Sequence, residues 1–483
     1  MAWRGFSVRD QLISDGGGRE ISAYLDALAR RELSDDPCLR LRELYWTLSR
    51  LFGHARRALV LPGSSAEAPP AVVIRGPPSW RPAETPLSAR APRRVRPRLL
   101  IDMTSTLRCG KNTGIQRVVR EIAFHGRAMG EGVPVAIHDG ELLPYYRDPA
   151  FPGPVSIEPG DIFLMLDATW NHVAEYLPII EAVKARGGAT IVGLHDILPL
   201  AYPAAFPPPV VRCMGEWMEK VVLTSDGVIA VSRAAAQSLR DFLVAQGRGE
   251  PQFPIGWWRL GDDFSCVAGG EPSPLARSIA EGGRPYFLGV GTVEPRKGYP
   301  VVIDALEKLW AEGVDATYVI VGSAGWGMRQ FARRMEGHHA FNRRLFWLKN
   351  ASDADLTLLY RNAHALVLAS VAEGFGLPIV EAAHHGAPVI ATDIPVFREV
   401  AGESARYFRL LDCDSLAEKM RAALIEKPRP PVLAPVSWRE SAIQLFSLVR
   451  GRNFGMPSSP PGGKTASPFE AIGLRAPQGG ARG

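Results

Sequence analysis

Two glutamates that lie close together in the sequence, Glu373 and Glu381, could bind the hydroxyl groups of a sugar or a ribose. Seven residues separate them, and the segment between them contains two glycines and a proline. Carboxylates accept hydrogen bonds strongly, so hydroxyl-rich ligands are natural partners for them. The alternative is that both glutamates are solvated side chains on a helix face. A second motif, which carries the opposite charge, argues against that alternative.

The two glutamates frame a glycine turn that the flanking sequence places between a strand and a helix. The apolar run 365–369 has the length of a buried strand. Gly374 and Gly376 let the backbone bend tightly, and Pro378 suits the first turn of a helix, where its missing N–H costs nothing. The N–H groups of Phe375–Leu377 would then point out of the helix start, where they can bind an anion.

The second motif is another strand–glycine–helix segment, and it carries two adjacent cations. Gly291 follows the apolar stretch 286–290, and Arg296 and Lys297 precede a helical pattern at 300–310. A guanidinium fork beside a point-charge ammonium is a good clamp for a diphosphate. An isolated Arg-Lys pair is usually exposed surface, but its position after a strand and a glycine turn favours the clamp.

Together these motifs, GTVEPRKG and EGFGLPIVEA, resemble those of retaining family-four glycosyltransferases of the GT-B architecture. The similarity extends from about Leu99 to about Val449, and bacterial polysaccharide mannosyltransferases look most alike. The resemblance implies that Arg296 and Lys297 hold the diphosphate of a nucleotide-sugar donor and that Glu381 holds its ribose. It also implies that the transferred sugar meets Glu373 and nearby backbone amides. The implied donor site comprises Gly291, Arg296, Lys297, Glu373, Gly374, Phe375, Gly376, Leu377 and Glu381.

The first half of the chain adds two candidate positions. A glycine turn after the strand at 99–101 lies, in the family, across the cleft from the diphosphate. Its implied ligands of the acceptor or diphosphate are Lys111, Asn112, Thr113 and Gly114. His195 follows the strand 190–194, at a carboxyl end where α/β sheets bind ligands. An isolated histidine is more often structural, but its position and the resemblance favour contact with the sugar. The expected catalytic set is His195, Glu373, Arg296 and Lys297.

The elements that must position these residues alternate between strand and helix, which predicts parallel sheets with right-handed crossovers. We therefore predict an α/β fold with two Rossmann-like domains facing a cleft, preceded by an N-terminal helical extension. That extension could be a packing appendage or a partner-binding helix pair. The expected strands are 99–101, 133–137, 162–166, 190–194, 228–231, 286–290, 317–321, 345–348, 365–369 and 388–391. The expected divisions are a helical extension (1–60), a Pro/Arg-rich linker (61–98), an acceptor domain (99–265), a nucleotide-sugar domain (284–436), a crossover helix (437–450) and a disordered tail (451–483).

Composition bounds the location and the partners. The chain is 46% hydrophobic and 22% charged, which is typical of a globular protein. It has no run of 18 or more apolar residues, so we expect no membrane-spanning helix, and the pattern of the first residues predicts no secretory signal. Five scattered cysteines without a CxxC motif favour reduced thiols and a cytoplasmic location. The net charge of +6 suits anionic small molecules and is too weak for nucleic acid. The linker arginines are either solvated or in peripheral contact with anionic lipid on the inner membrane face.

Two other classes of site are disfavoured. Gly289 and Gly291 begin like a dinucleotide-binding motif, but Glu294 takes the place of its third glycine. The acidic pair Asp353 and Asp355 follows a serine and is better explained as a helix cap. No cluster of histidines and cysteines suggests zinc. We therefore expect no cofactor and no required metal.

The function predicted from these observations is retaining sugar transfer in polysaccharide synthesis. The favoured donor is GDP-mannose, and the acceptor would be a saccharide or lipid-linked saccharide. Domain closure would exclude water, and attack on the same face of the sugar would retain its configuration, with Glu373 positioning the sugar. The alternatives are a UDP- or dTDP-sugar donor in the same fold, or a non-catalytic scaffold that binds sugar nucleotides.

Overall fold

The computed structural model describes residues 97–109, 113–146, 150–249, 251–263, 270–434 and 436–451. All of them belong to one compact unit of the chain, which spans residues 91–483. The expected helical extension (1–60), the linker up to residue 96 and the tail from residue 452 lie outside the described residues. Lys111 and Asn112 lie outside them as well.

A seven-stranded sheet forms the centre of the first lobe, which we define as residues 97–263 together with the helix at 438–451. Its strand order is β3-β2-β1-β4-β5-β6-β7, and all neighbouring pairs are parallel except β2 and β3. Strands β1 and β4 are buried along their whole length, as expected when helices cover both faces. The strands are β1 (Leu99–Asp102), β2 (Gly132–His138), β3 (Glu141–Pro144), β4 (Ile162–Met165), β5 (Ala189–Leu194), β6 (Gly227–Ala230) and β7 (Ile255–Trp257).

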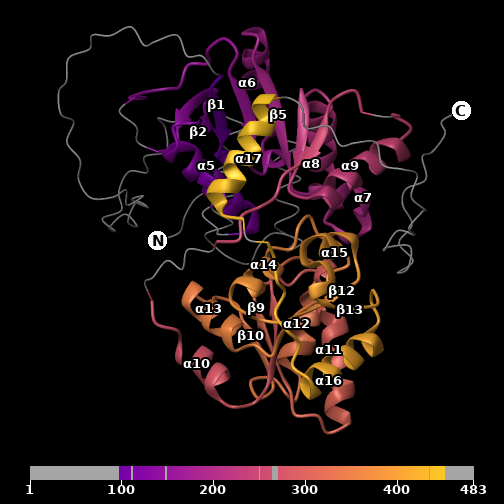
Figure 1. The fold of residues 1–483 in the computed structure, drawn as a ribbon. Helices are drawn as coiled ribbons and strands as arrows, with labels where there is room; N and C mark the ends of the chain where they lie inside the picture. Colours follow the sequence, from indigo (N-terminus) through magenta and orange to yellow (C-terminus); the bar gives the residue numbers. More distant parts are fainter. Residues whose placement is uncertain are drawn as a thin grey trace, which may run out of the picture. The chain divides into compact units, whose positions relative to one another are not determined.

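Helices cover both faces of this sheet. The last described helix, α17, lies beside α5, and Figure 1 shows it in yellow against the first lobe. Trp438 and Phe446 of α17 join the core that Ile101 and Val119 build, so the end of the chain completes the first lobe. The helices are α4 (Thr104–Cys109), α5 (Gly114–Ala128), α6 (Val173–Ala185), α7 (Leu198–Ala201), α8 (Pro208–Trp217), α9 (Arg233–Ala245) and α17 (Trp438–Gly451), with shorter turns η1 (Thr169–Asn171), η2 (Pro203–Ala205) and η3 (Met218–Val222).

The second lobe, residues 270–434, has a six-stranded sheet in which every neighbouring pair is parallel. Separate apolar clusters pack on its two faces. Its strands are β8 (Tyr286–Val290), β9 (Thr317–Val321), β10 (Leu345–Leu348), β11 (Ala365–Leu368), β12 (Val389–Thr392) and β13 (Arg406–Phe408). Its helices are α10 (Pro274–Glu281), α11 (Tyr299–Ala311), α12 (Arg329–Glu336), α13 (Asp353–Asn362), α14 (Leu377–His384), α15 (Pro395–Ala401) and α16 (Cys413–Ile425), with η4 (Pro295–Lys297) and η5 (Gly402–Ser404).

Two parallel-stranded sheets with helices on their faces confirm the predicted α/β fold class. The second sheet runs β10-β9-β8-β11-β12-β13, so its chain order reverses between β8 and β11. The first sheet reverses in the same way between β1 and β4. Ligands of doubly wound sheets bind beyond the carboxyl ends of the strands at such a switch point. Both sequence motifs follow the switch-point strands of the second sheet.

No helix in the part of the chain that the structure describes is long and apolar enough to cross a bilayer.

Candidate active site

The loops that follow β8 and β11 are tied together by their backbones. The N–H of Val371 donates to the carbonyl of Arg296 over 2.8 Å. Gly298 has a left-handed φ of 66°, and a Cβ at this position would collide with the carbonyl oxygen of Ala369. Gly298, the last glycine of the GTVEPRKG motif, is therefore required by the close approach of the loop that follows β11. This contact places the short turn η4, with its two cations, against the glutamate of the other loop.

One carboxylate and two cationic side chains meet at this point. Glu373 accepts from Arg296 Nη1 at 2.5 Å and from Lys297 Nζ at 2.6 Å. A second carboxylate, Glu294, contacts Arg296 Nε at 2.6 Å. Burial alone would raise the pKa of Glu373, but the two cations bring that pKa down to about 2. The carboxylate is thus ionised at neutral pH, and it pairs with both cations of the expected diphosphate clamp.

Glu381 lies on α14 and is held by groups from both lobes. Its Oε2 accepts from the hydroxyl of Tyr360 at 2.7 Å, and its Oε1 contacts Arg117 Nη1 at 2.5 Å. Arg117 belongs to α5 of the first lobe. Helix α14 begins after Gly376, whose φ of 108° favours glycine. The glycine turn therefore sets the direction in which α14 carries Glu381.

The turn between the two glutamates lies directly against the first lobe. The hydroxyl of Ser232 donates to the carbonyl of Gly374 over 2.6 Å. A Cβ added at Gly374 would collide with the carbonyl oxygen of His195. Phe375 and Leu377 pack against the core of the first lobe. The expected sugar-binding turn and the carboxyl end of β5 are therefore in contact.

The imidazole of His195 is anchored inside the first lobe. Its Nε2 lies 2.8 Å from the carbonyl oxygen of Leu166, and the residue is buried. Because a carbonyl can only accept, Nε2 carries the proton and Nδ1 is the acceptor nitrogen. Burial lowers the pKa of His195, so its ring is neutral at pH 7. Contact between His195 and a sugar hydroxyl stays a prediction.

The remaining expected residues are distributed around this cluster. Gly291, with φ of 136°, accepts from the Tyr299 hydroxyl at 2.8 Å, and a Cβ added to it would approach the side chain of Lys297. Thr113 and Gly114 lie at the start of α5, where the Thr113 hydroxyl bonds to the Gln116 amide. Tyr360, Arg117 and Ser232, which contact Glu381 or Gly374, were not among the expected site residues. Their partners lie far away in the sequence, so no spacing pointed to them.

The corresponding end of the first sheet holds two buried carboxylates. Asp102 accepts from the Thr104 N–H at 3.0 Å and from the Tyr176 hydroxyl at 2.8 Å. Asp167 accepts from the N–H groups of Thr106 and Ala168. Burial and the neighbouring Asp167 raise the pKa of Asp102 to about 7. Sequence reasoning did not single out either aspartate.

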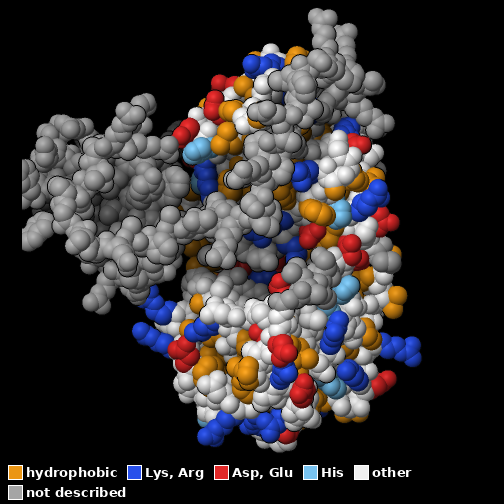
Figure 2. Space-filling model, turned by 90° about the vertical axis from the view of Figure 1, so that its left-hand side faces the viewer, with side chains coloured by type: hydrophobic (Ala, Val, Ile, Leu, Met, Phe, Trp, Pro, Cys, Tyr) orange, Lys and Arg blue, Asp and Glu red, His pale blue; other side chains and the backbone are white. Residues whose placement is uncertain are grey.

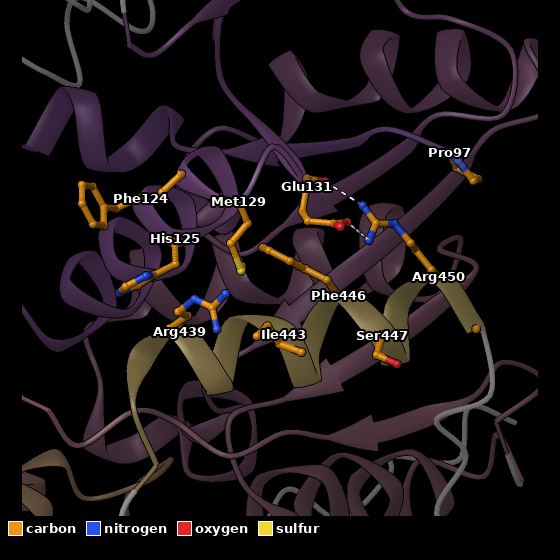
Figure 3. A pocket seen from close by; sticks show the side chains of 12 residues that line it. Pro97, Phe124, His125, Met129, Glu131, Arg439, Ile443, Phe446, Ser447 and Arg450 are labelled. Carbon is orange, nitrogen blue, oxygen red and sulfur yellow. Dashed lines mark hydrogen bonds and ion pairs between the residues drawn. The ribbon is translucent and has the colours of Figure 1, made fainter. Parts of the chain in front are cut away.

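A cavity of about 1010 Å³ lies away from the ion-paired cluster, between α5 and α17. Figure 3 shows the side chains of Phe124, Met129, Ile443 and Phe446 in it, with Arg450 paired to Glu131. None of the expected site residues lines this cavity. The candidate site is therefore the charged cluster of Arg296, Lys297 and Glu373 with the contacts around it.

Charge on the surface is mixed. On the face shown in Figure 2, acidic and basic side chains of the described residues are interspersed, without a broad patch of one sign. Such a patch is the usual footprint of nucleic-acid binding. Among the described residues, no group of three or more His, Cys, Asp and Glu side chains is arranged to hold a metal ion.

Comparison with protein families gives a match to the second lobe. Residues 275–434 match the sequence profile of the family described as "Glycosyl transferases group 1". The chain is 34% identical over 372 residues to the serotype-specific mannosyltransferase WbdA of Escherichia coli, and the alignment covers 71% of this chain and 44% of WbdA. The chain thus spans less than half the length of that relative.

Other known proteins resemble the chain more distantly. It is 26% identical over 355 residues to the O-antigen chain mannosyltransferase B of Escherichia coli, with 69% of this chain and 86% of that protein covered. Among solved structures, the chain resembles HepE of Anabaena in complex with UDP-glucose. The match covers 73% of this chain and 95% of HepE. It is 18% identical, with a TM-score of 0.49.

Proposed function

Because residues 275–434 are a domain of the glycosyl transferases group 1 family, we propose that this chain moves a sugar from a nucleotide-sugar donor to a saccharide acceptor. The reaction retains the anomeric configuration and serves polysaccharide synthesis. The favoured donor is GDP-mannose, since WbdA and the O-antigen chain mannosyltransferase B are both named as mannosyltransferases. The observation that carries the proposal is the cluster of Arg296, Lys297 and Glu373 at the switch point of the second sheet.

Donor binding exchanges partners within this cluster. The diphosphate takes Arg296 and Lys297 away from Glu373, and charge-assisted hydrogen bonds replace the ion pairs. Glu373 then accepts hydrogen bonds from hydroxyls of the transferred sugar. Glu381 accepts from the ribose hydroxyls, and the amides of Phe375–Leu377 face the sugar and its phosphate at the start of α14.

Loss of the diphosphate is the demanding chemical step. Arg296 and Lys297 stabilise the negative charge that grows on the leaving oxygen, and removal of one such donor typically costs about 3–4 kcal/mol of transition-state stabilisation. These two cations supply the charge for which other enzymes use a metal ion. While Glu373 is paired with Arg296 and Lys297, its pKa is about 2 and it is ionised at neutral pH. We assign to it hydrogen-bond acceptance and positioning of the sugar rather than proton donation.

The acceptor approaches from the first lobe. Thr113 and Gly114 at the start of α5, and Lys111 and Asn112 before them, bind the acceptor or the diphosphate. Nδ1 of His195 accepts a hydrogen bond from a hydroxyl of the transferred sugar, close to the anomeric centre. The acceptor hydroxyl attacks that centre from the face that the diphosphate leaves. A lipid-linked saccharide would bring the protein to the inner face of the cytoplasmic membrane. The free thiols Cys109, Cys213 and Cys413 suit the reducing cytoplasm.

Donor binding and hydrolysis test the proposal in purified full-length protein. GDP-mannose should raise the melting temperature, because a ligand that binds the native state stabilises it. UDP-glucose and dTDP-glucose, in parallel samples, test the alternative donors. Donor hydrolysis should fall about 100-fold or more in Lys297→Ala, by the loss of leaving-group stabilisation.

Lys308→Ala is the matched control, because Lys308 is an exposed lysine of α11 that pairs with Asp414. It should hydrolyse donor at the wild-type rate. Wild-type hydrolysis in Lys297→Ala would show that the clamp is assigned to the wrong residues. A protein that binds none of the three donors would overturn the proposed function.

A further inference from the structure

An ion pair between the two lobes covers the carboxylate that is expected to bind ribose. Arg117 Nη1 of α5 lies 2.5 Å from Oε1 of Glu381 on α14, and 264 residues separate the partners in the sequence. The other oxygen of Glu381 accepts from the Tyr360 hydroxyl. The side chain of Glu381 is 11% exposed and that of Arg117 is 27% exposed. The guanidinium thus lies on the more open side of a nearly buried carboxylate.

The starts of the same two helices are also in contact. A Cβ added to Gly114, at the start of α5, would lie 3.1 Å from Cδ1 of Leu377, at the start of α14. Arg117 follows Gly114 by about one helical turn, and Glu381 follows Leu377 by about one turn. The ion pair therefore continues an existing contact between helices. The Oε1 atom of Glu381, which pairs with Arg117, therefore faces α5.

We propose that Arg117 is a displaceable counter-ion, which holds Glu381 in the donor-free protein and leaves it when the ribose of a nucleoside diphosphate binds. This inference rests on the proposed function, because it takes Glu381 as the ribose ligand. A buried carboxylate without a partner is costly, so Arg117 stabilises Glu381 while the site is empty. Arg117 is in this sense a positioning residue. The nucleotide must displace it from Glu381, and the free energy needed for this displacement lowers the apparent affinity of the wild type for nucleotide.

The sign of a mutational effect separates this role from a simpler one. An arginine that merely attracts the donor phosphates would make nucleotide binding weaker when it is removed. A counter-ion that the ribose must displace makes binding tighter when it is removed, because the competing state is lost. The two roles therefore predict opposite changes for the same substitution.

Isothermal titration of the full-length protein with GDP, and separately with UDP, makes the test. Arg117→Gln should bind the nucleotide that the wild type prefers about fivefold more tightly, equivalent to ~1 kcal/mol for one partly exposed ion pair. Arg127→Gln removes the same charge from the same helix, where Arg127 lies over the ring of Tyr146. Its affinity should equal that of the wild type.

Two further variants connect the effect to Glu381. Glu381→Gln should weaken nucleotide binding, and adding Arg117→Gln to it should give no further tightening, because the pair is already broken. Arg117→Lys keeps the charge and gives up the guanidinium fork. The nucleotide affinity of Arg117→Lys should lie between those of the wild type and Arg117→Gln. If Arg117→Gln does not fold, Arg117→Lys takes its place in the test.

The outcomes separate this proposal from the proposed function. If the wild type binds nucleotide and Arg117→Gln binds it equally or more weakly, the counter-ion role is wrong and the glycosyltransferase assignment stands. Tightening that persists in the Glu381→Gln background would also overturn the role. If the wild type binds neither GDP nor UDP, both proposals fail together.

Discussion

The switch points of the first and the second sheet come from the same strand order, but the pKa values of their buried carboxylates are shifted in opposite directions. Between β1 and β4, Asp102 and Asp167 are buried among hydrogen-bond donors, and burial raises the pKa of each. Between β8 and β11, Glu373 is almost as deeply buried, yet Arg296 and Lys297 lower its pKa to about 2. Burial is similar, so the neighbouring charges decide the difference.

This difference separates a structural network from a site that can exchange partners. Asp102 joins its own strand to Thr104 and to Tyr176 of α6 by hydrogen bonds. Those bonds tie secondary-structure elements of one lobe together. The ion pairs of Glu373 join two adjacent loops and hold cations that an anionic ligand could bind instead. The two switch points are equivalent positions of the fold. The side chains at the second one, Arg296 and Lys297, present cations that could bind an anionic ligand.

The largest expected effect on stability comes from removing the charge of Glu373. Glu373→Gln leaves Arg296 and Lys297 without their shared partner, and breaking a buried ion pair typically lowers the free energy of unfolding by about 3 kcal/mol. The folded-state pKa of about 2 lies below the ordinary value of 4.5. The stabilisation is therefore present above pH 5 and is lost as pH falls towards 2. Urea denaturation of the wild type and Glu373→Gln at pH 7 and pH 3 measures the loss of unfolding free energy and its dependence on pH.

The control for Glu373→Gln is Glu336→Gln, which removes an exposed partner of Lys349. Exposed pairs contribute about 0–1 kcal/mol, so this variant should unfold almost like the wild type. If Glu373→Gln lost no more stability than Glu336→Gln at pH 7, the two switch points would not differ as the structure indicates.

Sequence patterns predicted the second switch point better than the first. The runs before Gly291 and Ser370 are apolar and long enough to specify strands, and the glycines after them announce turns. The two motifs also carry the family resemblance, which implied that Arg296, Lys297 and Glu373 bind one donor. The structure brings these three side chains together. Asp102 ends β1 and Asp167 lies just after β4, and neither belongs to a motif with a recurring spacing. Their pairing depends on β1 and β4 lying side by side, which only the folded sheet shows.

Three short strands and the ion pair between the lobes could not be predicted from the sequence, for other physical reasons. Strands β3, β7 and β13 have only three or four residues and lack the continuous apolar run that marks the other short strands. Their neighbours in the sheet stabilise them. The Arg117–Glu381 pair joins lobes that are far apart in the sequence. Sequence also gave no sign that Glu373 would pair with both cations. That arrangement depends on the two loops lying against each other, where a buried charge requires partners.

A smaller effect is expected where the second switch point touches the first lobe. Gly374→Ala would drive a methyl group into the carbonyl oxygen of His195, and overpacking of this kind costs about 1–3 kcal/mol. Gly215→Ala, in helix α8, has open space around its new methyl group and should be neutral or slightly stabilising. Thermal unfolding and donor hydrolysis of both variants measure the cost. Equal melting temperatures would mean that the turn and the end of β5 do not need their close contact.

The smallest effect concerns Asp102 and has the opposite pH dependence to that of Glu373. The pKa of Asp102 is about 7 in the folded protein against an ordinary 3.8, so its favourable contribution is complete below pH 4 and disappears as pH rises through 7. Asp102→Asn cannot ionise, and it also gives up one hydrogen-bond acceptor. Its stability should therefore be lower than that of the wild type at pH 5, by an amount that shrinks as pH rises to 8. The slope of that difference can reach at most about 1.4 kcal/mol per pH unit for one proton. A constant difference between pH 5 and pH 8, measured by urea denaturation, would mean that Asp102 is ionised throughout, and the two switch points would then hold their carboxylates in the same charge state.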